Sequence, residues 1–143
     1  MSGIKRTAAD KWFSDYIRAR DNWTCQRCGT KFKPYEEGGD NLGLKGLDNA
    51  HCFARGHNMT RFEPDNCMAL CYGCHSYMDS NGEEKKEFFA ERIGEERLQE
   101  LRVMSKIPYK NVKRDQKDIS ERFRSLFREM LSAQQNKTHY NDL

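Results

Sequence analysis

The sequence is poor in hydrophobic residues and contains no long hydrophobic run. Hydrophobic residues make up 36% of the 143 residues and charged residues 33%, whereas globular domains average about 45–50% apolar and about 25% charged residues. The longest apolar run, Cys67–Tyr72, is far shorter than the roughly 20 residues that a membrane-spanning helix needs. Residues 1–10 contain no apolar stretch of the signal-peptide kind. We therefore expect a cytoplasmic protein without a membrane segment, in which something besides apolar burial stabilises a small core.

The chain is too short for two full globular domains, because a domain usually contains about 100–200 residues. We expect one domain with a helical arm. Residues 1–22 are assigned to an N-terminal helix, residues 23–94 to the core, and residues 95–143 to a C-terminal helical extension.

Local patterns in the first half of the chain predict one helix, one loop and two strands. Thr7 and Asp10 have the spacing of a capping box, and apolar residues at helical spacing follow, which predicts a helix over Ala8–Arg20. Residues 33–46 combine several glycines with a proline and are expected to form a loop. Short strands are expected over Leu47–Phe53 and Cys67–Leu70.

The second half of the chain has a helical pattern. Ser80–Glu83 has the form of a second capping box, and Gly94 interrupts the apolar pattern that follows, which predicts two helices with a bend between them. Pro108 should end the second of them. A last helix is predicted over Asp115–Gln135, and the polar tail from Gln134 onward is expected to fray. The apolar face of this helix must pack on the same chain or on a partner copy.

Four of the six cysteines form two Cys-x-x-Cys pairs, Cys25/Cys28 and Cys71/Cys74. Two such pairs supply four thiolates, which is the ligand set of a closed tetrahedral zinc site. A redox motif or plain buried thiols would not explain two pairs. A metal that clamps both ends of the intervening unit would also contribute folding free energy to a chain with a small core. Cys52 and Cys67 are expected to be small buried residues rather than ligands or a disulfide.

The charges are unevenly distributed along the chain. Residues 83–100 contain seven acidic and four basic residues, whereas residues 106–128 contain eight basic and three acidic ones. A basic stripe is typical of a surface that binds nucleic acid, which makes Lys113, Arg114 and Lys117 candidate DNA contacts. A solvated helix face with ion pairs four residues apart would have the same composition.

The segment that closes the cysteine-flanked unit reads Asn66-Cys-Met-Ala-Leu-Cys71-Tyr-Gly-Cys74-His75, and it follows Asp48-x-x-His51-x-x-Ala-Arg55-Gly56. With the earlier Cys-x-x-Cys, this pattern resembles the zinc-flanked HNH endonucleases, which have the ββα-metal (His-Me finger) fold. Together with Arg61-Phe62-x-x-Asp65-Asn66, it is similar to the lambda-type phage recombination proteins NinG and Rap. The resemblance covers about residues 20–105 and implies an α+β fold: a small zinc-stabilised ββα-metal (HNH) core with flanking helices and a C-terminal helical arm.

The resemblance also implies a catalytic site. Phosphodiester hydrolysis requires a base that activates water, a metal that stabilises negative charge, and a group that holds the base in position. By the resemblance, His51 is the general base, His75 is a ligand of a catalytic Mg²⁺ or Mn²⁺ distinct from the zinc, and Asn66 orients the base through hydrogen bonds. A packed strand histidine at 51, a zinc ligand at 75 and an Asx turn at 66 are the respective alternatives.

One position departs from the HNH pattern. Ala50 stands where many HNH proteins carry a second metal ligand, directly before the base. Asp48 is the candidate in its place, with water as the alternative. In a regular strand Asp48 would lie on the face opposite to His51, so it could reach the metal only if the strand bends. His57 is a candidate metal ligand or phosphate contact, with a solvated loop histidine as the alternative.

We therefore expect a metal-dependent DNA endonuclease that acts on branched or double-stranded DNA in phage recombination or DNA processing. Arg55 and Arg61 would contact phosphate, because a guanidinium group matches phosphate oxygens; ordinary surface arginines are the alternative. The expected cofactors are one structural Zn²⁺ per chain and a catalytic Mg²⁺ or Mn²⁺, and a homodimer is one open arrangement. A zinc-stabilised nucleic-acid-binding or packaging accessory without catalysis would need the cysteines and the basic helix but not the two histidines and Asn66.

Overall fold

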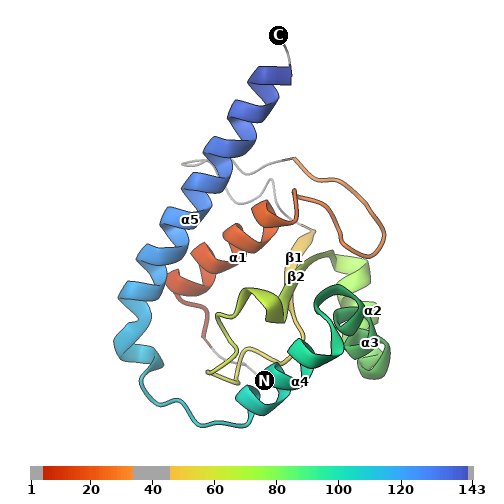
Figure 1. The fold of residues 1–143 in the computed structure, drawn as a ribbon, viewed down its shortest axis with the longest axis vertical. Helices are drawn as coiled ribbons and strands as arrows, with labels where there is room; N and C mark the ends of the chain where they lie inside the picture. The colour runs from red at the N-terminus through yellow and green to blue at the C-terminus, as the bar shows by residue number, and fades with distance from the viewer. Residues whose placement is uncertain (1–4, 34–45, 142–143) are drawn as a thin grey trace.

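The computed structural model describes residues 5–33 and 46–141 and has a mixed α+β fold (Figure 1). In chain order its elements are α1 (Ala8–Arg20), β1 (Leu47–His51), the short 3-10 helix η2 (Pro64–Asn66), β2 (Cys67–Cys71), α2 (Tyr72–Ser80), α3 (Gly82–Ile93), α4 (Glu95–Ser105) and α5 (Val112–Asn141). Most of the predicted loop over residues 33–46 lies outside the described residues. Among the helices of the described part, none has both the length and the apolar character needed to cross a membrane.

The two strands form an antiparallel hairpin in which His51 lies opposite Cys67. The sequence predicts both strands, but β1 ends at His51 rather than at Phe53. The side chain of Asn66 accepts a hydrogen bond from the Phe53 N–H at 2.8 Å and donates one to the Phe53 carbonyl at 3.0 Å. These bonds occupy the backbone groups that would have continued the ladder. β2 leads directly into α2, so the chain order at the hairpin is strand, strand, helix.

Helix α1 begins and ends where the sequence predicts. The Thr7 hydroxyl accepts a hydrogen bond from the Asp10 N–H at 3.3 Å, and the Asp10 carboxylate accepts one from the Thr7 N–H at 2.9 Å. This reciprocal capping box satisfies backbone donors that the first turn of a helix leaves unpaired. The buried side chains of Phe13 and Ile17 fix the face that α1 turns toward the rest of the molecule.

The helices after the hairpin follow the prediction except at one cap. Gly94 separates α3 from α4 with a φ of +91°, a backbone conformation that glycine adopts without a steric penalty. The predicted capping box at Ser80–Glu83 is wrong, because Ser80 is the last residue of α2 and the Asn81 side chain makes no capping bond to α3. Helix α4 ends at Ser105, ahead of Pro108.

Helix α5 is longer than predicted at both ends and packs on α1. Its apolar face is covered within the chain: Phe123 and Phe127 are fully buried, and the ring centroids of Phe13 and Phe123 are 4.7 Å apart. The predicted fraying from Gln134 is wrong. The backbone stays helical through residue 141, and the Gln134 side chain accepts a hydrogen bond from the Trp23 ring nitrogen at 3.1 Å.

One hydrophobic core joins the three sequence segments. It contains Ala19 from α1, Trp23 from the start of the cysteine-flanked unit, Leu70 from β2, Leu101 from α4 and Phe127 from α5, all of them buried. Figure 1 shows α5 running alongside α1 on one side of the hairpin, with α2, α3 and α4 on the other side. The hairpin and the start of α2 are therefore held between two helical groups.

Candidate active site

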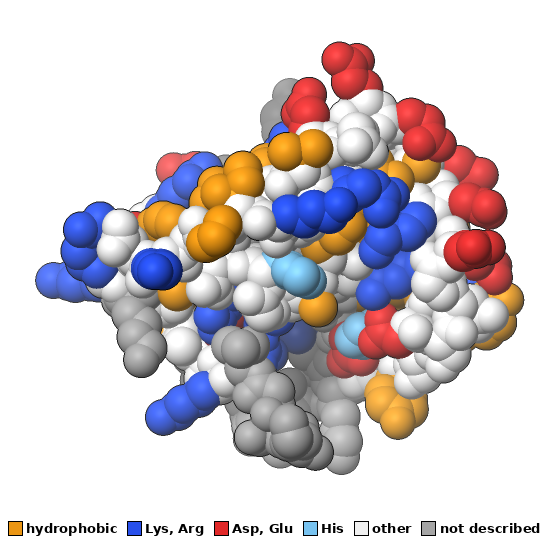
Figure 2. Space-filling model, turned by 90° about the horizontal axis from the view of Figure 1, so that it is seen from below, with side chains coloured by type: hydrophobic (Ala, Val, Ile, Leu, Met, Phe, Trp, Pro, Cys, Tyr) orange, Lys and Arg blue, Asp and Glu red, His pale blue; other side chains and the backbone are white. Residues whose placement is uncertain are grey.

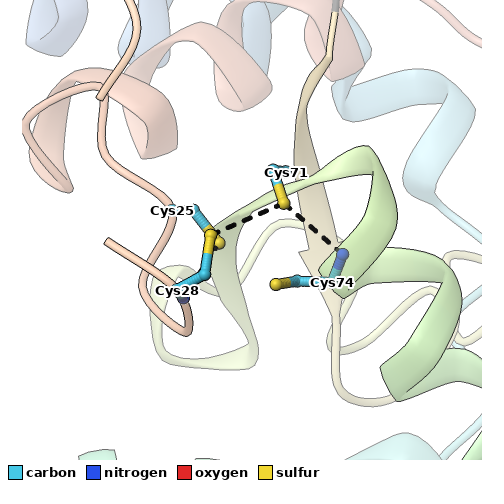
Figure 3. A group of neighbouring side chains, drawn as sticks. All are labelled: Cys25, Cys28, Cys71 and Cys74. Carbon is cyan, nitrogen blue, oxygen red and sulfur yellow. Dashed lines mark hydrogen bonds between the residues drawn. The ribbon is translucent and has the colours of Figure 1, made fainter. Parts of the chain in front are cut away.

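The four predicted zinc ligands lie together at the corner where β2 turns into α2. The Sγ atoms of Cys25, Cys28, Cys71 and Cys74 all lie within 4.8 Å of one another. Figure 3 shows the two pairs approaching this common space from separate segments. The second cysteine of each pair donates its backbone N–H to the sulfur of the first, at 3.5 Å for Cys28 and 3.4 Å for Cys74. Gly29 follows the first pair with a φ of +80°, a conformation that glycine adopts without a steric penalty.

The chemistry of the four thiols fits a zinc ion. Hydrogen bonding to Thr30 lowers the pKa of Cys28 to about 6, whereas burial raises the pKa of Cys74 to about 12. Adjacent thiols cannot all ionise without a cation between them, because thiolates repel one another at this distance. A Zn²⁺ ion would supply that charge, and four cysteine ligands would leave it no open position, as is typical of structural zinc sites. Cys52 and Cys67 are buried free thiols outside this cluster, as predicted.

A cavity of about 630 Å³ lies beside the cysteine cluster and gathers several predicted site residues. Its lining residues are Arg6, Ser14, Arg18, Asp48, Asn49, His51, Ala54, Arg55, Gly56, His75, Asp79 and Lys85. Asp48 and His51 line the same cavity, although strict alternation in a regular strand would place them on opposite faces. Along β1, Leu47 and Ala50 are buried while Asp48, Asn49 and His51 are partly buried. This pattern departs from strict alternation, and two-stranded ribbons twist more strongly than larger sheets.

His51 is fixed in one tautomer by a backbone carbonyl. Its Nε2 lies 3.1 Å from the Arg61 carbonyl oxygen. A carbonyl oxygen only accepts hydrogen bonds, so Nε2 carries the proton and Nδ1 keeps its lone pair. Burial lowers the pKa of His51 from 6.5 to about 4. The ring is therefore neutral at pH 7, with one nitrogen available as a proton acceptor.

His75 lies between two carboxylates. Its Nδ1 is 2.9 Å from Asp48 Oδ2, and its Nε2 is 3.3 Å from Asp79 Oδ2. The hydrogen bond to Asp48 raises the pKa of His75 above its ordinary value. Asp79 also pairs with Lys85 at 2.9 Å. Sequence reasoning missed Asp79, although its place four residues after His75 on one helix puts the two side chains on the same face.

Asn66 forms a staple across the loop that follows His51. It is fully buried, and besides its two bonds to Phe53 its amide donates to the Thr60 carbonyl at 3.0 Å. The β1–β2 loop is thereby closed on itself just beyond the histidine. These bonds hold the loop after His51, and Asn66 does not line the cavity; the role of Asn66 in orienting the base stays a prediction.

Arg61 is not available as a phosphate contact. Its side chain is buried, and its guanidinium donates to Asp10 through Nε at 3.0 Å and Nη2 at 2.5 Å. The predicted role is therefore corrected: the Arg61 side chain joins the loop to α1, and its backbone carbonyl holds His51. Arg55, by contrast, lines the cavity.

The basic residues of the cavity differ from those expected on the last helix. Arg18 reaches the cavity with its guanidinium held by the Leu47 carbonyl at 2.8 Å and by Asp15 at 3.0 Å. Arg114 and Lys117 are exposed on α5 and do not line this cavity; the side chain of Lys113 lies outside the described set. Figure 2 shows Lys and Arg side chains near two histidines, with acidic side chains directly beside one of the histidines and also along one edge of this face.

Comparison with known proteins places the chain in a family. The family model of the bacteriophage lambda NinG protein matches residues 5–132. Neither a curated protein nor a solved structure matches the chain. Because the matched segment includes both cysteine pairs, the hairpin and most of α5, the chain belongs to the bacteriophage lambda NinG protein family.

Proposed function

We propose that this protein is a metal-dependent endonuclease that hydrolyses phosphodiester bonds in DNA. One observation carries the proposal: a single cavity brings together a neutral histidine of defined tautomer, His51, and a histidine–carboxylate pair, His75 and Asp48, suited to a divalent cation. Membership of a phage recombination family favours DNA as the substrate. The strand–strand–helix order around these residues supports an HNH-type site.

His51 is assigned the role of general base. Its Nε2–H is held by the Arg61 carbonyl, so Nδ1 would take the proton from the attacking water. A base must be unprotonated at the working pH, and the low pKa of His51 meets this condition. Arg55 also lines the cavity and would bind a phosphate oxygen, because guanidinium groups bind phosphate through paired hydrogen bonds.

His75 and Asp48 are assigned to the catalytic metal. A divalent cation bound there supplies positive charge that stabilises the transition state and the departing oxygen. Mg²⁺ commonly binds through only one or two carboxylates and keeps several water ligands, so two protein ligands suffice. The two ring nitrogens of His75 face different carboxylates, so one ion would bind beside only one of them. Asp48 is the better candidate, because Lys85 competes for Asp79.

The proposed zinc would position this site indirectly. Cys74 belongs to the cysteine cluster and His75 is the next residue in the first turn of α2. A zinc ion bound by the two pairs would therefore fix the start of α2, and with it the direction of the His75 side chain.

The test is cleavage of supercoiled plasmid, linear duplex and a synthetic four-way junction with added Mg²⁺ or Mn²⁺ and without either. We expect metal-dependent cleavage that His51→Ala abolishes and that Val103→Ala, an exposed substitution on α4, leaves unchanged. Omission of the divalent metal is a better control than a chelator, which would also remove zinc. Cleavage that survives His51→Ala, or DNA binding without cleavage in any metal, would refute the endonuclease proposal. The second outcome would identify a non-catalytic binding module.

A further inference from the structure

A second cavity of about 320 Å³ adjoins the candidate active site; we call it the linker cavity. Its lining residues are Gly56, His57, Asn58, Ser105, Lys106, Ile107, Pro108, Tyr109 and Lys110. Gly56 lines both cavities, so the two are neighbours along the β1–β2 loop. The other wall of the linker cavity is the segment between α4 and α5.

Side chains of the loop anchor this segment. His57 Nδ1 lies 3.1 Å from the Ser105 carbonyl, and Asn58 donates its amide to the Tyr109 carbonyl at 3.1 Å. These two contacts bracket the stretch Lys106-Ile-Pro108. The stretch is therefore held beside the loop that carries Arg55 and Gly56, rather than only tethered between two helices.

The surface of the linker cavity combines positive charge with exposed apolar atoms. Lys106 and Lys110 are exposed, and among the described residues no acidic side chain lines the cavity. Ile107 lies between them with 46% of its surface exposed. Apolar side chains flanked by lysines are typical of protein surfaces that pack against an unstacked base step while binding the neighbouring phosphates.

We propose that the linker cavity binds branched DNA beside the scissile phosphate, with Lys106 and Lys110 on the backbone and Ile107 against a base exposed at the branch. This inference rests on the proposed function, since it takes DNA as the substrate of the adjoining cavity. A continuous duplex stacks its bases and offers Ile107 no exposed face without an unstacking cost, whereas a branch point has already lost that stacking. Ile107 therefore confers the preference for branched over continuous DNA, and the lysines strengthen binding to both.

The experiment measures binding rather than cleavage. All variants carry His51→Ala, no divalent metal is added, and fluorescence anisotropy gives the Kd for a four-way junction and for a linear duplex of matched sequence. We expect Ile107→Ala to reduce the junction-to-duplex affinity ratio by about fivefold to tenfold, because packing against one base is lost. Val103→Ala is the matched control: Val103 is equally apolar, is 54% exposed on α4 and does not line the linker cavity.

The contribution of Lys106 and Lys110 is tested by the salt dependence of DNA binding. Replacing both Lys106 and Lys110 by Ala should weaken binding to both DNAs and lower the slope of log affinity against log salt by about two, since each lysine on a phosphate releases about one counterion. Replacing both by Arg should preserve the slope. An unchanged affinity ratio in Ile107→Ala, or an unchanged salt slope without the lysines, would overturn the inference.

The two proposals can fail separately. If the active protein cleaves DNA but Ile107→Ala keeps the full junction preference, the endonuclease stands and the linker cavity has no part in branch recognition. If no DNA is cleaved under any condition but Ile107→Ala loses the preference, the endonuclease proposal fails and the linker cavity remains a DNA-binding site.

Discussion

Asp10 and Arg61 form a buried two-point ion pair, although 51 positions separate them in the sequence. The same Arg61 presents its backbone carbonyl to His51 Nε2 at 3.1 Å. Asp10 also closes the capping box of α1. One carboxylate thus links the start of α1 to the backbone group that sets the tautomer of the proposed base.

Asp10→Asn should destabilise the fold and loosen His51. Removing one partner of a buried ion pair typically costs about 3–5 kcal/mol, because the other charge is left uncompensated. Urea unfolding measures this loss, and NMR of the histidine ring nitrogens reports whether His51 keeps its proton on Nε2. Arg114→Ala is the control: it breaks an exposed pair with Asp115, and exposed pairs contribute only about 0–1 kcal/mol. Equal effects of the two substitutions would contradict the structural role of Asp10.

The pKa values of His51 and His75 should be shifted in opposite directions from the ordinary value of a histidine. Burial lowers the pKa of His51 to about 4, and Asp48 raises that of His75. In long-range ¹H–¹⁵N spectra without added divalent metal, we expect His51 to remain the neutral Nε2–H tautomer at pH 5.5, while His75 is protonated at that pH. A His51 that titrates near its ordinary value would rule out the enclosed position on which its assigned role depends.

The lowered pKa of His51 also makes the free energy of unfolding depend on pH. The unfolded chain binds a proton at this residue near pH 6.5, whereas the folded chain binds it only near pH 4. The unfolded state therefore binds more protons between these values, so the free energy of unfolding falls as the pH is lowered through this range. His51→Gln should flatten that part of the stability profile. An unchanged slope would show that other groups cause the loss.

Removing the proposed zinc should unfold the region where β2 leads into α2. With four cysteine ligands in two segments, we expect about one Zn²⁺ per chain and a large loss of thermal stability on chelation, because the free energy of metal binding contributes to folding. Cys71→Ser should lose the metal. Cys52→Ala should keep it, since Cys52 is a buried cysteine outside the cluster. Folded, metal-free wild-type protein with unchanged stability would contradict the zinc assignment.

Some of this architecture follows from local sequence signals. The capping box at Thr7 predicts the start of α1, Gly94 predicts the break between α3 and α4, and the two cysteine pairs predict one cluster. The capping box and Gly94 each act within a few residues, so the backbone chemistry behind them does not depend on the rest of the fold. The cysteine pairs are far apart in the sequence, but their shared ligand chemistry predicts that they meet. The expectation for Asn66 has a different source. The motif resemblance implies that this residue orients the base through hydrogen bonds.

Other features depend on contacts that no local pattern reveals. From the sequence, Arg61 is expected to contact phosphate or to lie on the surface. Its burial is explained only by its distant partner, Asp10. Strict alternation along a regular strand predicts that Asp48 faces away from His51, yet both residues line one cavity. The role proposed for Ile107 could not be inferred from the sequence either, since Gly56, which lines the same cavity, comes from a separate loop.

Asp48→Asn should weaken binding of the proposed catalytic metal more than Asp79→Asn. Both carboxylates contact His75, but Asp79 is also paired with Lys85, and that pairing must break before Asp79 can bind an ion. Titration with Mn²⁺, followed by paramagnetic broadening of the His75 ring signals, measures each affinity; loss of a direct ligand should cost at least about tenfold. The reverse order would move the site to the Nε2 side of His75.

Helix α5 should stabilise the whole domain rather than act as a detachable arm. Phe127 is fully buried and contacts both Trp12 and Trp23, with ring centroids 6.0 and 6.2 Å apart. Phe127→Ala should therefore lower the free energy of unfolding by about 3–5 kcal/mol, the usual cost of removing a buried aromatic ring. Val103→Ala, on an exposed surface, should change it by less than about 0.5 kcal/mol. A Phe127→Ala protein with wild-type stability and a single unfolding transition would show that α5 is not part of the core, and the basic face of α5 would then belong to a separately mobile element.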